Sequence, residues 1–180
     1  MAISTLRNAL MPTSADTLEA LIAKQAISEQ IYAYCRAMDR IDRELGHAVW
    51  HPDGVADYGA IFQGTGAEFI ELVCTGHLRL EGHSHQVSNI LIEVRGDRAY
   101  SEAYVTAALR ERREGRLFQM TVRGRYVDQW ELRDGRWAIT RRTYVHDFDD
   151  VRAVEEIGRE GWSRRDREDP VYVLGPPGES

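Results

Sequence analysis

The sequence lacks the residues that several broad classes of protein require. Only two cysteines occur in 180 residues, Cys35 and Cys74, and they are far apart and outside any metal-ligand spacing. This pattern argues against a disulfide scaffold and suits a reducing compartment. No run approaches 18 apolar residues, and the N-terminus has neither a long apolar core nor a small-residue cleavage site. We therefore expect a cytoplasmic protein that is neither exported nor membrane-spanning.

An excess of basic charge is missing as well. The 23 Lys and Arg against 29 Asp and Glu give a formal net charge of −6, which disfavours nucleic acid as a partner. The chain contains no GxxxxGK[ST] loop, no GxGxxG turn, no GxSxG elbow and no cysteine-rich zinc spacing. His83 and His85 form an HxH pair, which by itself is a weak signal for a metal. We therefore expect neither a cofactor nor a metal.

What is present is the composition of one globular domain. Hydrophobic residues make up 43% of the chain and charged residues 29%, a balance that a single core of this size accommodates. We expect a flexible arm over residues 1–15, one domain over 16–148, and a charged C-terminal extension over 149–180 that ends in a disordered tail. Residues 151–158 of the extension are a candidate helix.

Helical periodicity marks the first part of the domain. Apolar residues recur near helical spacing between Leu18 and Met38, which predicts a helix that begins after Ser14 or Asp16 and reaches about residue 45. The sequence HPDG at 51–54 then breaks the pattern. Residues 55–62 predict a short strand, and a second helix starting near Ala67 is expected to end around 74–76.

From residue 85 the period of the apolar residues changes to two. Strands are predicted at 85–95, 98–111, 116–132 and 136–147. The turns RGD at 95–97 and RDG at 133–135 predict antiparallel hairpins, and the charged run 110–116 is interpreted as a solvated hairpin tip. The order of elements predicts an α+β fold with helices on one face of a curved antiparallel sheet.

Asp39 and His85 are the first two candidates for chemistry. Asp39 lies near the end of the first predicted helix, beside Met38 on the apolar stripe. It is either a buried carboxylate or an exposed residue paired with Arg36 or Arg43. His85 opens a predicted strand, and it either borders the cavity of the sheet or has only a structural role. Strand alternation places on its side Val87, Asn89 and Leu91.

The last predicted strand contains two adjacent arginines, Arg141 and Arg142. If one face of this strand is buried, one of the two points inward, and a buried guanidinium needs an anionic partner or a substrate. Periodicity leaves open which arginine does so. Strand alternation places on the side of Arg142 the residues Ala138, Thr140, Tyr144 and His146. His83 precedes the predicted strand and is expected in a loop.

Three segments, taken in order, resemble the SnoaL-like branch of the nuclear-transport-factor-2-like superfamily. They are YCRAMD, HQVSNILIEVRGDRAYSEAYV and GRYVDQWELRDGRWAITRR, and the resemblance covers residues 17–148. It implies a cystatin-like α+β cone, in which the curved sheet wraps around helices and encloses one deep apolar pocket. It also implies a homo-oligomer, either a dimer or a trimer.

Similar proteins in this branch include the cofactor-free lyases scytalone dehydratase, bile acid 7α-dehydratase and hexachlorocyclohexane dehydrochlorinase. The resemblance implies that Asp39 orients His85 and that Tyr34 and Arg142 line the pocket. A carboxylate on one ring nitrogen leaves the other nitrogen as a base near neutral pH. Tyr34 or Arg142 would then stabilise a leaving hydroxide or halide, or an enolate oxygen. We expect a cofactor-independent lyase that acts by elimination on a hydrophobic cyclic or aromatic molecule.

Two other functions stay open at this point. The same base would serve a carbon-carbon lyase or an isomerase in aromatic or steroid catabolism, because each of these reactions begins with a positioned base. The chain would otherwise be a non-catalytic binding protein or the small subunit of a ring-hydroxylating dioxygenase. In that case Asp39 and His85 would be structural.

Overall fold

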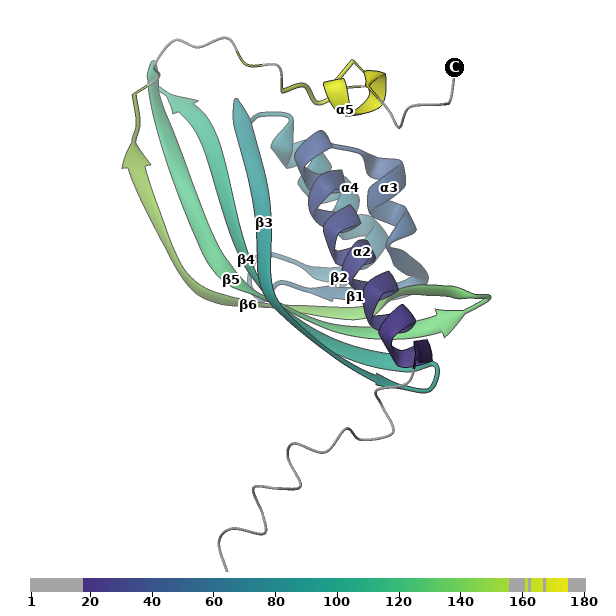
Figure 1. Cartoon of the computed structure of the whole chain (residues 1–180). Coiled ribbons are helices and arrows are strands. Elements are labelled where there is room, and N and C mark those ends of the chain that lie inside the picture. Colours follow the sequence, from purple (N-terminus) through teal and green to yellow (C-terminus); the bar gives the residue numbers. More distant parts are fainter. Residues whose placement is uncertain (1–17, 156–160, 162, 167, 175–180) are drawn as a thin grey trace, which may run out of the picture.

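One long helix and four long strands dominate the fold (Figure 1). The computed structural model describes residues 18–155, 161, 163–166 and 168–174. Its elements are α2 (Leu18–Arg40), α3 (Arg43–Ala48), β1 (Trp50–Asp57), β2 (Gln63–Thr65), α4 (Gly66–His77), β3 (Gly82–Arg95), β4 (Arg98–Arg113), β5 (Arg116–Arg133), β6 (Arg136–Ala153) and α5 (Pro170–Val173). The predicted arm at 1–15 and the tail at 175–180 lie outside the described residues.

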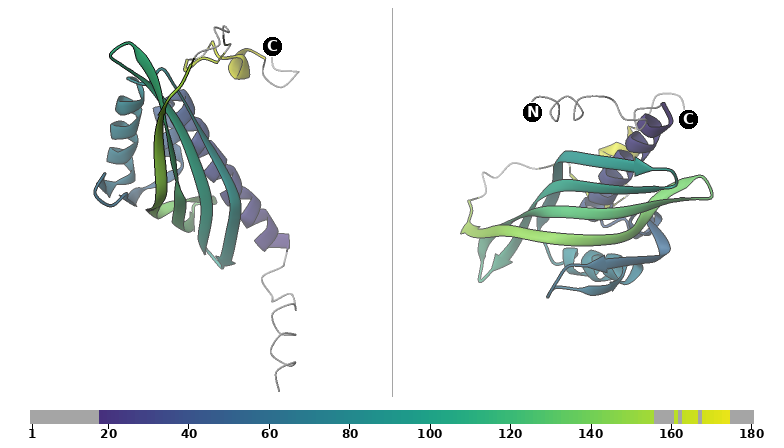
Figure 2. Two further views of the ribbon diagram at one scale, coloured as in Figure 1. Left: turned by 90° about the vertical axis from the view of Figure 1, so that its left-hand side faces the viewer. Right: turned by 90° about the horizontal axis from the view of Figure 1, so that it is seen from below.

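The strands form a single curved sheet in the order β2-β1-β6-β5-β4-β3. Strands β3 to β6 pair antiparallel in sequence, and β1 joins β6 in parallel. The helices α2 and α4 lie on the concave side of this sheet (Figures 1 and 2). The sheet does not close, because β2 and β3 remain its two edges. The predicted α+β class with a curved sheet around helices is confirmed.

The core fills the space between α2, α4 and the concave side of the sheet. On α2 the fully buried residues recur at helical spacing and include Ile27, Ile31, Tyr34 and Met38. α4 begins with a capping box, in which the Thr65 side chain accepts from the Glu68 backbone N–H and the Glu68 carboxylate accepts from the Thr65 N–H. This cap explains why α4 starts where the sequence predicts a second helix.

The first helix ends earlier than predicted. It stops at Arg40 rather than near residue 45, because Ile41 adopts a left-handed conformation with φ of 54°. The Asp42 N–H then donates to Ala37 O at 2.9 Å, and the Asp42 side chain caps α3 through the Leu45 N–H at 3.0 Å. As a result, Asp39 lies in the last turn of α2.

Three other boundaries differ from the sequence predictions. Residues 51–54 belong to β1, where they form an irregularity in its pairing with β6, and β1 ends at Asp57. Most of the charged run 110–116 extends β4 and β5, which leaves Glu114 and Gly115 as the turn. Strand β6 continues to Ala153, so residues 151–153 are not helical, while 156–160 lie outside the described residues.

The described C-terminal residues pack against the end of α2. The Asp169 carboxylate lies 3.5 Å from Arg40 Nε, and the guanidinium of Arg36 lies 5.2 Å from the centre of the Tyr172 ring. Arg165 donates to the carbonyl oxygens of His77 and Leu80, just after α4. Within the described part of the chain, no helix combines the length and the apolar character needed to cross a membrane.

Candidate functional site

Strand β3 carries His83 and His85 on one side, towards α2 and α4. His83 is therefore a strand residue, and its prediction as a loop residue was wrong. A bulge between Ser88 and Leu91, with Asn89 at φ of 51°, shifts the alternation farther along the strand. Leu91 is 69% exposed, so the prediction that it shares the side of His85 was wrong as well. The inward side of the second half is formed by Ile90, Ile92 and Val94.

Asp39 and His85 meet where the end of α2 lies against the start of β3. Asp39 Oδ1 is 2.7 Å from His85 Nδ1, and Asp39 Oδ2 accepts the His85 backbone N–H at 3.1 Å. Both carboxylate oxygens therefore hold one residue. Because an ionised carboxylate only accepts hydrogen bonds, Nδ1 of His85 carries the proton, and the lone pair of the neutral ring is on Nε2.

The surroundings of this pair leave His85 Nε2 available. The side chains of His85 and Asp39 are 9% and 18% exposed, and no hydrogen bond to His85 Nε2 is formed by the part of the chain that the structure describes. The alternative partner Arg43 pairs with Glu71 at 2.9 Å.

Two further histidines lie beside the pair. His83 Nε2 donates to Met38 O at 2.9 Å, and His77 Nδ1 lies 3.4 Å from the same oxygen. Burial lowers the pKa of His83. Burial, followed by the neighbouring His83 and His85, lowers the pKa of His77 to about 4. Both rings are thus neutral near neutral pH. We did not predict from the sequence that His83 and His77 share Met38 O as a partner. The only signal near this contact was the HxH spacing of His83 and His85.

These histidines do not form a metal site. Within the described ranges, no cluster of His, Cys, Asp and Glu side chains has the geometry to hold a metal ion. One nitrogen of each of these two rings is already engaged, since Nε2 of His83 faces a carbonyl oxygen and Nδ1 of His85 faces a carboxylate.

Arg142 forms a second polar cluster inside the core. Thr140 is an extra residue in β6, because Ile139 pairs with Trp130 while Arg141 pairs with Gln129. The bulge brings Arg142 to the buried side of β6 and leaves Arg141 exposed. Arg142 is therefore the arginine that points inward. The prediction that Arg142 shares its side with Thr140 was wrong.

The buried guanidinium of Arg142 is held by Asp128 on β5. Arg142 Nε and Nη2 donate to the two Asp128 oxygens at 2.7 Å each, and neither side chain is exposed. Burial opposes the charge of Arg142, but the Asp128 carboxylate outweighs it and keeps the pKa of Arg142 well above its usual range. This is a bidentate, charge-assisted pair. The sequence did not lead us to predict Asp128 as the partner of Arg142. The signal was a carboxylate on the apolar side of the alternating segment YVDQW.

Aromatic rings surround this ion pair. The centres of the Tyr34 and Tyr126 rings lie 4.1 Å and 4.0 Å from the Arg142 guanidinium carbon. The hydroxyls of Tyr34 and Tyr58 are 3.0 Å apart, and burial raises the pKa of both, so both stay protonated. The structure thus brings Tyr34 together with Arg142, and Asp39 together with His85, as two clusters.

The two clusters differ in their access to a cavity. A groove of about 400 Å³ is lined by Tyr32, Cys35, Arg36, Asp39, Arg40, His85, Gln86 and Val87. It runs between α2 and β3, and it includes charged side chains, so it differs from the deep apolar pocket that we expected. Neither Tyr34 nor Arg142 belongs to its lining. A ligand in this groove would therefore lie against Asp39 and His85 rather than against Tyr34 and Arg142.

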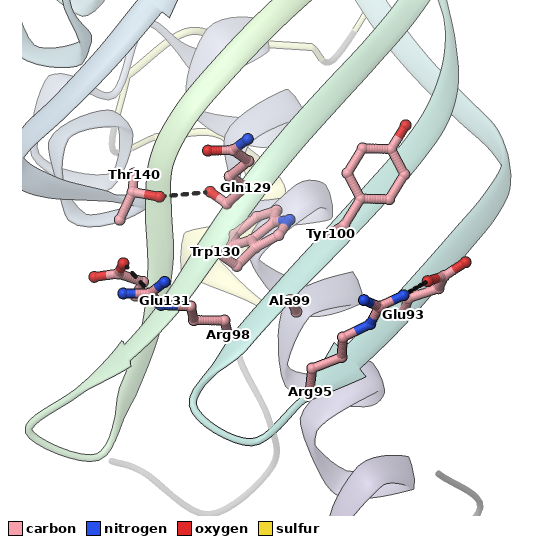
Figure 3. A pocket seen from close by; sticks show the side chains of 9 residues that line it. All are labelled: Glu93, Arg95, Arg98, Ala99, Tyr100, Gln129, Trp130, Glu131 and Thr140. Atoms are coloured by element: carbon pink, nitrogen blue, oxygen red, sulfur yellow. Dashed lines mark hydrogen bonds and ion pairs between the residues drawn. The ribbon is translucent and has the colours of Figure 1, made fainter. Parts of the chain in front are cut away.

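Another cavity, of about 430 Å³, lies on the sheet towards the hairpin turns (Figure 3). It contains no histidine, and its charged side chains neutralise one another. Glu93 lies 3.2 Å from Arg95, and Arg98 lies 3.5 Å from Glu131. These exposed pairs offer no free base or acid, so the groove beside Asp39 and His85 is the better candidate site.

The sequence matches the model of the SnoaL-like domain over residues 19–143. The chain belongs to the SnoaL-like domain family. The matched segment contains both clusters, from Tyr34 and Asp39 through His85 to Arg142. No curated protein matches this SnoaL-like chain.

Solved structures with the same fold include proteins named as enzymes. A protein of Novosphingobium aromaticivorans with the provisional name scytalone dehydratase is 27% identical, with a TM-score of 0.65 and coverage of 78% of this chain and 97% of that one. Hexachlorocyclohexane dehydrochlorinase LinA-type3 of Novosphingobium barchaimii is 17% identical, with a TM-score of 0.65 and coverage of 80% and 98%. A cystatin-like protein of unknown function from Nostoc punctiforme is 23% identical, with a TM-score of 0.58 and coverage of 69% and 90%. The last two establish likeness of fold only.

Proposed function

We propose that the protein is a cofactor-independent lyase that uses Asp39 and His85 as its catalytic base. The observation that carries this proposal is the 2.7 Å contact between Asp39 Oδ1 and His85 Nδ1, on the wall of a groove, with Nε2 of the ring unpaired among the described residues. An imidazole oriented by a carboxylate is a common general base. The dehydratase name of the structure that is 27% identical agrees with this chemistry.

The proposed reaction is an elimination. His85 Nε2 takes a proton from a carbon of the substrate, and the electron pair of that C–H bond becomes the new C=C bond. The leaving group departs with its own bonding electrons, as hydroxide or halide. A departing hydroxide takes the proton from the His85 imidazolium and leaves as water. When a halide departs, the imidazolium releases its proton to the solvent. Asp39 stabilises the imidazolium while that charge exists.

Tyr34 and Arg142 are proposed to stabilise the charge that develops away from the base. Tyr34 has a protonated hydroxyl and Arg142 is a cation, so both are suited to an oxyanion or a halide. This role requires a substrate that extends from the groove to the inner cluster. A hydrophobic cyclic or aromatic molecule suits both surroundings, because Tyr32 and Val87 line the groove and aromatic rings surround Arg142.

The test is a screen in which the product is identified by its mass. Wild-type protein and the His85→Ala variant are incubated with cyclic and aromatic alcohols, halides and ketones, and the products are separated by mass spectrometry. Elimination yields a product lighter by water or by a hydrogen halide, from the wild type only. A product of unchanged mass would identify an isomerase, and loss of a carbon fragment would identify a carbon-carbon lyase. Equal turnover by both proteins would refute the role of His85.

A non-catalytic role is the outcome that remains if no turnover depends on His85. Recovery of a large iron-sulfur oxygenase subunit in a pulldown would then identify the chain as a small subunit. The prediction of a homo-oligomer, dimer or trimer, is tested separately by light scattering of the purified protein.

A further inference from the structure

The carbonyl group of Met38, directly before Asp39, receives an unusual number of donors. His83 Nε2 from β3 lies 2.9 Å from Met38 O, Ile41 N lies 3.3 Å away, and His77 Nδ1 from the end of α4 lies 3.4 Å away. Carbonyl groups in the last turn of a helix have no partner within the helix. Here that need is met by α4 and β3, which meet at the peptide next to the proposed orienting acid.

The hydrogen bonds to Met38 O hold the last turn of α2 in place. Two unfavourable effects, one of the backbone and one of charge, act against this position of the turn. Ile41 is a β-branched residue at φ of 54°, a strained conformation that only surrounding contacts maintain. Asp39 places a carboxylate at the negative end of the helix dipole, which is unfavourable. A loosened last turn would relieve both effects, and it would move the Asp39 carboxylate away from His85.

The neutral His83 ring is well suited to donate one fixed hydrogen bond to Met38 O. A carbonyl oxygen only accepts, so the proton of the neutral His83 ring is on Nε2. Its Nδ1 is buried and has no hydrogen-bond partner among the residues that the structure describes. Protonation would leave that second N–H without an acceptor, close to His77 and His85, whose ring centres are 4.3 Å and 6.3 Å away. The neutral ring with one N–H is therefore the form that fits.

We propose that His83 is a positioning residue for Asp39 and His85, which acts by holding the Met38 carbonyl so that the Asp39 carboxylate stays on His85 Nδ1. This inference rests on the proposed function, because the position of Asp39 has a catalytic meaning only if His85 is the base. His77 gives the same carbonyl a second, longer contact and is the weaker of the two anchors.

The experiment compares His83→Leu with His83→Gln by NMR of the full chain. Glutamine can place an amide N–H where Nε2 of histidine stands, whereas leucine has similar bulk and no donor. The readout is the low-field imidazole signal of the His85 Nδ1–H proton, which is assigned by its loss in His85→Ala. Asp39→Ala gives the spectrum expected without the carboxylate. Ser84→Ala, at an exposed neighbouring position of β3, is the control.

We expect His83→Leu to lose or broaden this signal, as Asp39→Ala does, while His83→Gln and Ser84→Ala retain it and all variants keep a folded amide spectrum. An unchanged signal in His83→Leu would overturn the proposal. Loss in both His83 variants would overturn it too, because the donor would then not be the cause. Since the spectrum needs no substrate, the result is independent of whether the elimination itself is found.

Discussion

The two polar clusters of this protein are built from the same kind of pair, a carboxylate and a basic side chain, but they differ in what is left unpaired. Asp128 and Arg142 form a doubly hydrogen-bonded pair with no exposure, enclosed by aromatic rings. Asp39 holds only one ring nitrogen of His85, at the wall of a groove. The first pair is closed to solvent and fixes a structure, although Arg142 Nη1 has no hydrogen-bond partner among the described residues. The second pair lies beside a cavity, and the imidazole of His85 keeps Nε2 for a proton.

The largest expected effect comes from the fully buried pair of Asp128 and Arg142. Asp128→Ala leaves the Arg142 guanidinium charged and without its partner in the core, and breaking such a pair costs about 3–5 kcal/mol. We expect the free energy of unfolding in urea to fall by this amount. Arg141→Ala, on the exposed side of β6, should change it by no more than about 0.5 kcal/mol. A small effect of Asp128→Ala would show that the pair is not a structural anchor.

A pH effect of intermediate size should come from His77. Its pKa is lowered to about 4 in the folded protein, against 6.5 for an ordinary histidine. The unfolded chain therefore binds a proton in this window that the folded chain does not, so stability is full above pH 6.5 and declines as the pH falls towards 4. The free energy of unfolding should fall by roughly 2 kcal/mol over this range, after allowance for the partial exposure of His77. Urea unfolding of wild type and His77→Gln at several pH values measures it, and equal slopes would contradict the account.

A smaller effect is expected from the tyrosine hydroxyls of the inner cluster. Tyr34→Phe removes the 3.0 Å hydrogen bond to Tyr58 and keeps the ring over Arg142. Loss of one such bond costs about 1 kcal/mol. Tyr58→Phe is the matched variant for the other hydroxyl, and a double-mutant cycle on unfolding measures the coupling of the two. Additive effects would show that the hydroxyls do not interact.

The smallest change in stability is expected at the other cluster. Asp39→Ala loses the hydrogen bonds to His85 but also removes a carboxylate from the negative end of α2, and the two effects offset each other to within about 1 kcal/mol. Urea unfolding measures the difference. A loss as large as that of Asp128→Ala would mean that Asp39 and His85 are structural.

The order of elements could be predicted from the sequence because periods of 3.6 and 2 are properties of single segments. In two strands, however, the side of the sheet on which each residue lies could not be predicted, because each of these strands contains an extra residue. The bulges at Asn89 in β3 and Thr140 in β6 reverse the alternation, which is why Leu91 is exposed and why Arg142 rather than Arg141 is buried. Neither residue is a glycine or a proline, which are the strongest local signals of an interruption in a strand.

The candidate site could be predicted only in part. The positions of Asp39 and His85 in the predicted helix and strand made them candidates, and the resemblance to the family implied that the acid orients the base. The two side chains are in contact. Their catalytic role stays a prediction. The contacts of His83 and His77 with Met38 join three elements distant in the sequence, and periodicity carries no information about such contacts. The same holds for Asp128, whose partner is on the next strand.

The most direct test of the central claim is a double-mutant cycle on turnover of a substrate found by the mass screen. Each of His85→Ala and Asp39→Ala is expected to lower kcat/KM, the first by about 10²–10⁴-fold. Because the two residues act as one base, the double variant should be no slower than His85→Ala alone. Losses that multiply in the double variant, or a His85→Ala variant as active as the wild type, would contradict the account.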